Sequence, residues 1–173
     1  MVDKRKIRIL VAKPGTDSHF RGAELIAQIL RNAGMEVIYT GRYQTSEMIV
    51  STAVAEDVDV VALSSLAWSQ EKFYTEVAQM LKKKGSDIIV IGGGIISEKA
   101  KPKLIKAGVT GLYGPGTPNE VIINHIKGRV EKERWNKKST SKKAAPTKAA
   151  PPKKATPAKA APKKTATKKS TKK

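Results

Sequence analysis

The sequence predicts an α/β fold in which five parallel strands form one sheet with helices on both faces. Five short apolar runs alternate along the chain with five segments of helical periodicity, an order typical of repeated βα units. The chain of 173 residues is long enough for one domain with a sizeable core. The sheet is therefore expected to lie between two layers of helices.

The first two βα units occupy the N-terminal third of the chain. An apolar run over residues 7–12 predicts the first strand, and helical periodicity over 21–33 predicts the helix that follows it. Gly34 stands where that helix should end. The second unit combines a short strand over 36–39 with a helix over 46–56.

The other three units repeat this order. Their strands are expected at 58–63, 87–91 and 109–113, and their helices at 70–84, 101–107 and 118–130. Gly85 and Gly108 stand where the third and fourth helices should end. The last helix is preceded by Thr117 as a predicted N-cap, with Pro118 as its first residue and Glu120 completing a capping box.

Five units in about 130 residues fit a flavodoxin-like sheet of order 2-1-3-4-5 better than a six-stranded dinucleotide-binding fold. The order of the strands reverses between the first and third strands. In open α/β sheets, ligands bind outside the carboxyl ends of the strands at this switch point. The loops that follow the strands are therefore the place to look for function.

The C-terminal part of the chain has a different composition. Residues 136–173 contain 14 lysines and no acidic, aromatic or large aliphatic residue, so they cannot bury a core and should be disordered. The remaining residues hold 20 Lys and Arg against 15 Asp and Glu, which is about +5 of the total net charge of +19. We expect a folded domain over 1–135 and a disordered basic tail, rich in Lys, Ala and Pro, over 136–173.

Cysteine is absent from the sequence, which excludes disulfides, thiolate metal sites and cysteine nucleophiles. The basic N-terminus is followed by an apolar run that stops at Ala12, too short for a signal-peptide core or a membrane span. We expect a soluble cytoplasmic protein.

Small residues and one histidine gather in the loops that should meet at the carboxyl edge of the sheet. The segments are Asp17-Ser18-His19-Phe20-Arg21-Gly22, Ser64-Ser65-Leu66-Ala67, Gly92-Gly93-Gly94 and Gly114-Pro115-Gly116-Thr117. Glycine lets a backbone approach a ligand closely and serine adds a hydroxyl, so these loops suit a deep slot. Taken alone, each glycine loop is an ordinary tight turn and the histidine a hydrogen-bonded loop residue, but together they favour a binding site.

Residue types at this edge exclude several other sites. A phosphoacceptor receiver domain needs acidic residues after the first strand and an Asp at the end of the third, where this chain has Ala12-Lys13 and Leu63-Ser64. The G-x-G-x-x-G, G-x-x-x-x-G-K-[ST] and G-x-S-x-G motifs are missing from these loops. Zinc is disfavoured, because two histidines and no cysteine would leave carboxylates to supply most ligands.

The spacing of the loop motifs is specific. Asp17-x-His19-x-x-Gly22 is followed after 41 residues by Ser64-x-Leu66, and after 26 more by Gly93-Gly94. This pattern resembles the D-x-H-x-x-G, S-x-L and G-G signature of cobalamin-binding domains, and most of all the cobalamin-binding part of methylmalonyl-CoA mutase and related acyl-CoA mutases. The resemblance covers about residues 5–130 and leaves out the tail.

The resemblance implies a set of roles around adenosylcobalamin. His19 would be the lower axial ligand of cobalt, Asp17 would accept the other imidazole N–H, and Lys13 would extend this relay. The nucleotide tail of the cofactor would enter a slot lined by Gly22, Ser64, Leu66, Gly93 and Gly94, with Gly114, Gly116 and Thr117 near its end. No catalytic acid or base is expected in this chain. His125, in the last predicted helix, has no motif around it.

Three positions depart from the mutase pattern. Ser18 replaces the usual glycine and Phe20 the usual aspartate, and Trp68 stands in a segment where small residues and a histidine are common. These differences affect the shape of the loops, the contacts with the corrin, or the surface shown to a partner. Phe20 and Trp68 are either exposed hydrophobic side chains that await a partner chain or locally packed ones.

The resemblance also implies which partners the chain needs. The first strand begins near residue 7, which leaves no room for the four-helix cap of corrinoid carriers and cobalamin-sensing regulators, and the chain has no TIM barrel for an acyl-CoA. We therefore expect the cofactor-carrying subunit of a split acyl-CoA mutase, working with a large barrel subunit. Methylmalonyl-CoA is the leading substrate, followed by 2-hydroxyacyl-CoA.

The basic tail suggests an alternative. Its lysine doublets, separated by Ala, Pro, Ser and Thr, resemble the terminal domain of linker histones and would bind DNA or RNA without sequence preference. A solubilising appendage, or one that docks on an acidic partner, explains the same composition. The alternative function is thus a cobalamin-responsive regulator or carrier protein tethered to nucleic acid.

Overall fold

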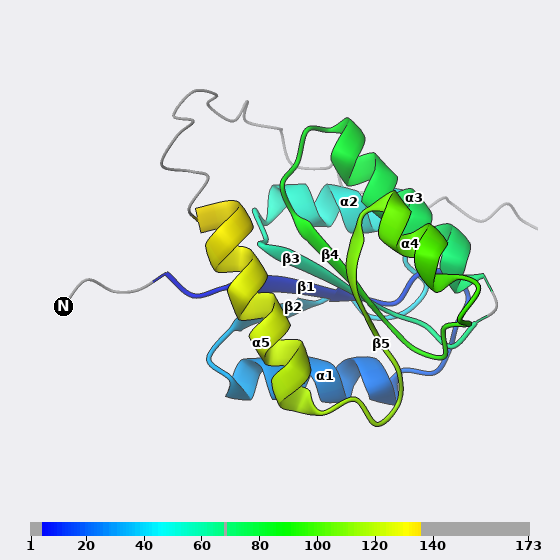
Figure 1. Ribbon diagram of the computed structural model, residues 1–173, viewed down its shortest axis with the longest axis horizontal. Coiled ribbons are helices and arrows are strands. Elements are labelled where there is room, and N and C mark those ends of the chain that lie inside the picture. Colours follow the sequence, from blue (N-terminus) through cyan, green and yellow to red (C-terminus); the bar gives the residue numbers. More distant parts are fainter. Residues whose placement is uncertain (1–4, 68, 136–173) are drawn as a thin grey trace, which may run out of the picture. The chain divides into compact units, whose positions relative to one another are not determined.

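The computed structural model describes residues 5–67 and 69–135, and it confirms the predicted sheet (Figure 1). All strand pairs are parallel, and the order is β2-β1-β3-β4-β5. The strands are β1 (Arg8–Ala12), β2 (Glu36–Tyr39), β3 (Val60–Ser64), β4 (Ile89–Gly93) and β5 (Val109–Tyr113). The third and fourth strands start two residues later than predicted and extend further, because Ser64 pairs with Gly93 at their carboxyl ends.

The helices agree closely with the predicted ranges. They are α1 (Arg21–Asn32), α2 (Ser46–Ala55), α3 (Gln70–Lys83), α4 (Lys101–Ala107) and α5 (Asn119–Val130). Gly34, Gly85 and Gly108 follow the first, third and fourth helices with positive φ angles, as the sequence predicts. Trp68 and the predicted disordered tail over 136–173 lie outside the described residues.

Two apolar layers hold the sheet between the helices. Leu10 and Ala12 of β1 face the layer that packs under α2, α3 and α4, whereas Ile9 and Val11 face the layer under α1 and α5. Successive side chains of a strand point to opposite faces, so β1, an inner strand between β2 and β3, is buried from both sides. Figure 1 shows α1 and α5 together on one face of the sheet.

The start of α5 differs from its predicted capping. Pro118 has ψ 138, an extended conformation, so it precedes the helix as its N-cap residue instead of forming its first turn. The Thr117 hydroxyl donates to the Gly114 carbonyl 2.8 Å away and does not cap the helix. The turn between β5 and α5 therefore uses the hydroxyl that a capping box would need.

A short π-helical turn over Glu131–Trp135, which the sequence patterns do not indicate, continues α5. It places Arg134 at the edge of the sheet where β3 and β4 begin, and the side chain is 2% exposed there. Its guanidinium lies 3.0 Å from a carboxylate oxygen of Asp59 and 3.0 Å from one of Asp87. This ion cluster lies at the amino ends of β3 and β4, opposite the loops that follow the strands.

None of the helices formed by residues 5–67 and 69–135 has the length and apolar character that crossing a bilayer requires.

Candidate functional site

A buried lysine and aspartate lie directly after β1. The Lys13 side chain is fully buried, and its ammonium donates to Asp17 Oδ2 at 2.9 Å and to the Ser64 carbonyl at 3.1 Å. The Asp17 carboxylate also accepts hydrogen bonds from the backbone N–H of Leu66 at 2.7 Å and of His19 at 3.0 Å. One carboxylate thus ties the loop after β1 to the loop after β3.

Asp17 is held in its ionised form. Burial acts to raise the pKa of this carboxyl, but the hydrogen bonds from Leu66, Lys13 and His19 outweigh it and hold the pKa well below its ordinary value. An ionised carboxylate can only accept hydrogen bonds. Its partners must therefore all be donors.

The ionised Asp17 determines which ring nitrogen of His19 carries a proton. Its Nδ1 lies 2.8 Å from Asp17 Oδ1, and because that oxygen only accepts, Nδ1 carries the ring proton. In the neutral imidazole, Nε2 then has a free lone pair, and the side chain is 72% exposed. A carboxylate thus orients the ring, and Nε2 is left able to accept a hydrogen bond or to bind a metal ion.

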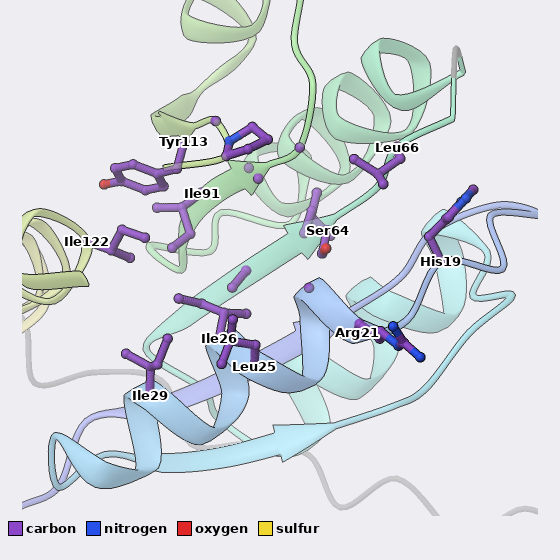
Figure 2. Close-up of a pocket in the computed structure, with 18 of the residues that line it drawn as sticks. His19, Arg21, Leu25, Ile26, Ile29, Ser64, Leu66, Ile91, Tyr113 and Ile122 are labelled. Atoms are coloured by element: carbon purple, nitrogen blue, oxygen red, sulfur yellow. The ribbon is translucent and has the colours of Figure 1, made fainter. Parts of the chain in front are cut away.

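An apolar cavity of about 720 Å³ opens beside His19 (Figure 2). Polar side chains line its mouth beside His19, namely those of Ser18, His19, Arg21 and Ser64, and Asn119 at the start of α5 also lines the cavity. Further in, the walls are apolar and come from both sides of the slot, with Leu25, Ile26 and Ile29 on α1 facing Ile91, Tyr113 and Ile122. This slot suits a ligand with a polar part at the mouth and a flat or apolar part inside.

Packing requires glycine at two of the three positions where β4 ends, Gly92 and Gly94. A Cβ on Gly94, whose φ is +137°, would lie 1.9 Å from the Ser65 carbonyl oxygen, and one on Gly92 would lie 2.6 Å from the Tyr74 ring. A Cβ on Gly93 would meet only ordinary contacts, the nearest at 3.8 Å. All three glycines line the cavity, so the chain can approach a ligand closely at this wall.

Tyr74 of α3 contacts the strand ends behind the glycine wall of the cavity. Its buried hydroxyl lies 2.7 Å from the Gly93 carbonyl and 3.2 Å from the Leu63 carbonyl, so it links the carboxyl ends of β3 and β4. Burial raises the pKa of this phenol, which keeps the hydroxyl protonated as a donor. An aromatic residue within a helical apolar stripe gives no sequence signal for such a role.

The structure brings most of the predicted site residues together. Seven of them line the cavity: His19, Gly22, Ser64, Leu66, Gly93, Gly94 and Gly114. Lys13 and Asp17 lie behind His19. Gly116 and Thr117 are not among the lining residues that the structure describes, and Pro115 and Asn119 line the slot at that end instead.

Sequence reasoning missed the apolar wall on α1. Leu25 stays 64% exposed although it is a large hydrophobic residue, because it faces the slot and not the core. The signal was present in the helix, whose apolar positions Leu25, Ile26 and Ile29 extend beyond the stripe needed to cover the sheet.

Comparison with known proteins assigns the chain to a family. The family model of the B12 binding domain matches residues 7–123. The chain belongs to the B12-binding domain family. The matched range contains His19, the relay behind it and the walls of the cavity up to Ile122.

Two curated relatives are similar in sequence, and one solved structure shares the fold. The chain is 39% identical over 130 residues to the 2-hydroxyisobutanoyl-CoA mutase small subunit of Aquincola tertiaricarbonis, covering 75% of this chain and 96% of that protein. It is 43% identical over 115 residues to the methylmalonyl-CoA mutase of Escherichia coli, covering 66% of this chain but 16% of that protein. A cobalamin-binding protein from Desulfitobacterium hafniense has the same fold, with a TM-score of 0.59 and 22% identity over 76% of this chain and 60% of that one.

Proposed function

We propose that this chain is the cobalamin-binding subunit of an adenosylcobalamin-dependent acyl-CoA mutase and works with a separate large chain. It is similar over nearly the whole length of a mutase small subunit, and the same domain forms a minor part of a much longer methylmalonyl-CoA mutase. The observation that carries the proposal is the free Nε2 of His19 at the mouth of the slot, with Nδ1 held by Asp17.

The residues present fit this cofactor. His19 would bind cobalt from the lower side, Asp17 would hold the ring in the required tautomer, and the buried Lys13 would keep Asp17 ionised. The slot would accept the nucleotide tail, because its apolar interior suits a benzimidazole and its mouth offers Ser64 and Arg21 to the polar part. When bound, adenosylcobalamin supplies an adenosyl radical that permits a 1,2-rearrangement of the substrate.

The large chain would hold the acyl-CoA. We assign no catalytic acid or base to this chain, since the polar groups of its cavity are placed for cofactor binding. The relatives act on different acyl groups, as their names state, so methylmalonyl-CoA and 2-hydroxyacyl-CoA are the substrates to test first. The alternative of a regulator or carrier tethered to nucleic acid is not favoured, because these relatives are mutase chains.

Electron paramagnetic resonance of bound cob(II)alamin tests the ligand. The full chain labelled with ¹⁵N-histidine should show the doublet splitting of a ¹⁵N imidazole ligand, where benzimidazole gives the triplet of ¹⁴N. The sequence has two histidines, so His125→Ala is a matched control that should keep the doublet, whereas His19→Ala should lose it. A doublet that survives in His19→Ala would refute the assignment.

Reconstitution tests the reaction. The chain, adenosylcobalamin and a large mutase chain should together isomerise an acyl-CoA, and the His19→Ala variant should have far lower activity. If the reconstituted pair isomerises none of the acyl-CoA substrates although cobalamin is bound through His19, the protein carries the cofactor for another purpose.

A further inference from the structure

Phe20, Arg42 and Tyr43 form a stack beside His19. The guanidinium carbon of Arg42 lies 5.4 Å from the centre of the Phe20 ring and 5.5 Å from that of the Tyr43 ring, both within cation–π range. Phe20 follows His19 directly and lines the cavity, whereas Arg42 and Tyr43 belong to the loop between β2 and α2 and are not among its lining residues. The stack therefore joins a neighbouring loop to the histidine loop from outside the slot.

The loop that carries Arg42 is firmly attached to the segment before His19. The N–H of Gln44 donates to the Lys13 carbonyl at 3.0 Å, and the N–H of Gly15 donates to the Gln44 carbonyl at 2.9 Å. The Gln44 side chain closes the turn by donating to the Arg42 carbonyl at 3.1 Å. Arg42 thus projects from a fixed base.

Tyr43 shows that this loop is held in an unusual conformation. Its φ is +63°, in the left-handed region that residues other than glycine seldom adopt. Such a conformation persists where the surrounding contacts hold it. The Tyr43 ring is 56% exposed and contacts the guanidinium of the neighbouring Arg42.

The histidine loop lacks the support that a capping side chain would give. Phe20 occupies the N-cap position of α1 and makes no side-chain hydrogen bond there, so only its carbonyl serves the first turn. The aspartate that the mutase pattern has at this position is a favourable N-cap residue, and phenylalanine is not. The contact with Arg42 is instead a side-chain contact that Phe20 makes to a neighbouring loop.

We infer that Arg42 is a positioning residue for His19. By holding the Phe20 ring at the start of α1, it limits the movement of the loop between Asp17 and α1 and keeps the exposed imidazole in the direction that Asp17 sets. This inference rests on the proposed function, since it concerns how the chain prepares His19 for cobalt.

Substitutions in the Phe20–Arg42 contact should weaken cobalamin binding by a small, measurable factor. An exposed cation–π contact corresponds to a two- to fivefold change in an equilibrium constant. Arg42→Gln and Phe20→Leu should each weaken binding of cob(II)alamin to the full chain by that factor and lower the histidine-ligated fraction in the ¹⁵N spectrum. Arg42→Lys and Phe20→Tyr keep the cation and the ring, so both should retain most of the affinity. Arg31→Gln, the same change at the far end of α1, should have no effect.

A double-mutant cycle separates positioning from a general structural role. In a His19→Ala background, Arg42→Gln should leave cobalamin affinity unchanged, because Arg42 acts through the imidazole. Equal losses in both backgrounds, or a histidine-ligated fraction that is unchanged in both Arg42→Gln and Phe20→Leu, would overturn the inference. A wild-type chain that binds cobalamin without histidine ligation would instead overturn the proposed function.

Discussion

Replacing Asp17 by asparagine should destabilise the domain strongly. The carboxylate accepts hydrogen bonds from Lys13, from two backbone N–H groups and from the His19 ring. An amide of the same shape turns one of its two acceptor atoms into a donor and leaves the fully buried Lys13 ammonium without a counter-charge. Breaking a buried ion pair in this way costs about 3–5 kcal/mol.

The assay is urea unfolding of the full chain, followed by circular dichroism. Asp17→Asn should lower the free energy of unfolding by about 3–5 kcal/mol at pH 7. Replacing both members of the pair, as in Lys13→Met with Asp17→Asn, should restore much of the loss, because no buried charge remains. Histidine ligation of cobalt should stay impaired in the double variant, since nothing then fixes the tautomer of His19.

The dependence on pH gives a second check. The pKa of Asp17 in the folded chain lies below its ordinary value of 3.8, so its contribution to stability is fully present well above that pH. It is lost as the pH falls below 3.8 towards the lowered value, and the gap between wild type and Asp17→Asn should narrow there. Two results would refute this reasoning. One is a free energy of unfolding for Asp17→Asn within about 1 kcal/mol of wild type at pH 7, which is less than a factor of ten in the equilibrium constant. The other is a double variant less stable than Asp17→Asn alone.

Two further substitutions change supports of the site, with Gly114→Ala as a control, and a third changes the opposite edge of the sheet. Tyr74→Phe removes the hydroxyl that links two strand ends and should cost about 1–3 kcal/mol in urea unfolding, with weaker cobalamin binding; an unchanged affinity would contradict its role in the slot. Gly94→Ala should yield little folded protein in thermal melts, whereas Gly114→Ala, where a Cβ meets open space, should melt like wild type. Arg134→Met should lower the free energy of unfolding by about 1.5–3 kcal/mol, because the buried Asp59 loses one of its two cationic partners and keeps Arg5 at 3.2 Å, while cobalamin binding at the opposite edge persists in the folded fraction.

The strands and helices could be predicted from the sequence because apolar periodicity and the residues that end helices act locally. The strand order followed from the number of βα units. The apolar run that ends at Ala12 and the glycines after the helices each restrict the backbone wherever they occur. The predicted capping of α5 by Thr117 was wrong, because its hydroxyl has two possible hydrogen-bond partners and the turn after β5 determines which one it uses. That choice depends on residues brought together by folding.

The site was predictable to the extent that its residues belong to the motif. The hydrogen bond from the Leu66 backbone to Asp17 and the apolar wall of α1 are absent from any motif, since one is a main-chain group and the other consists of ordinary helix residues. The Arg42 stack is a contact between two loops that are more than 20 residues apart in the sequence. Such contacts follow from the strand order, which places β2 beside β1.

The shared carboxylate has a consequence for how the two halves of the cofactor site communicate. Asp17 fixes the imidazole through one oxygen and the backbone of Leu66 through the other, so ordering of either segment lowers the entropic cost of ordering the second. Under the proposed function, a ligand that fills the slot and steadies the loop after β3 would favour ligation at His19, and ligation would favour the filled slot by the same coupling free energy. Cooperativity between the nucleotide part of the cofactor and its cobalt would then depend on this single side chain.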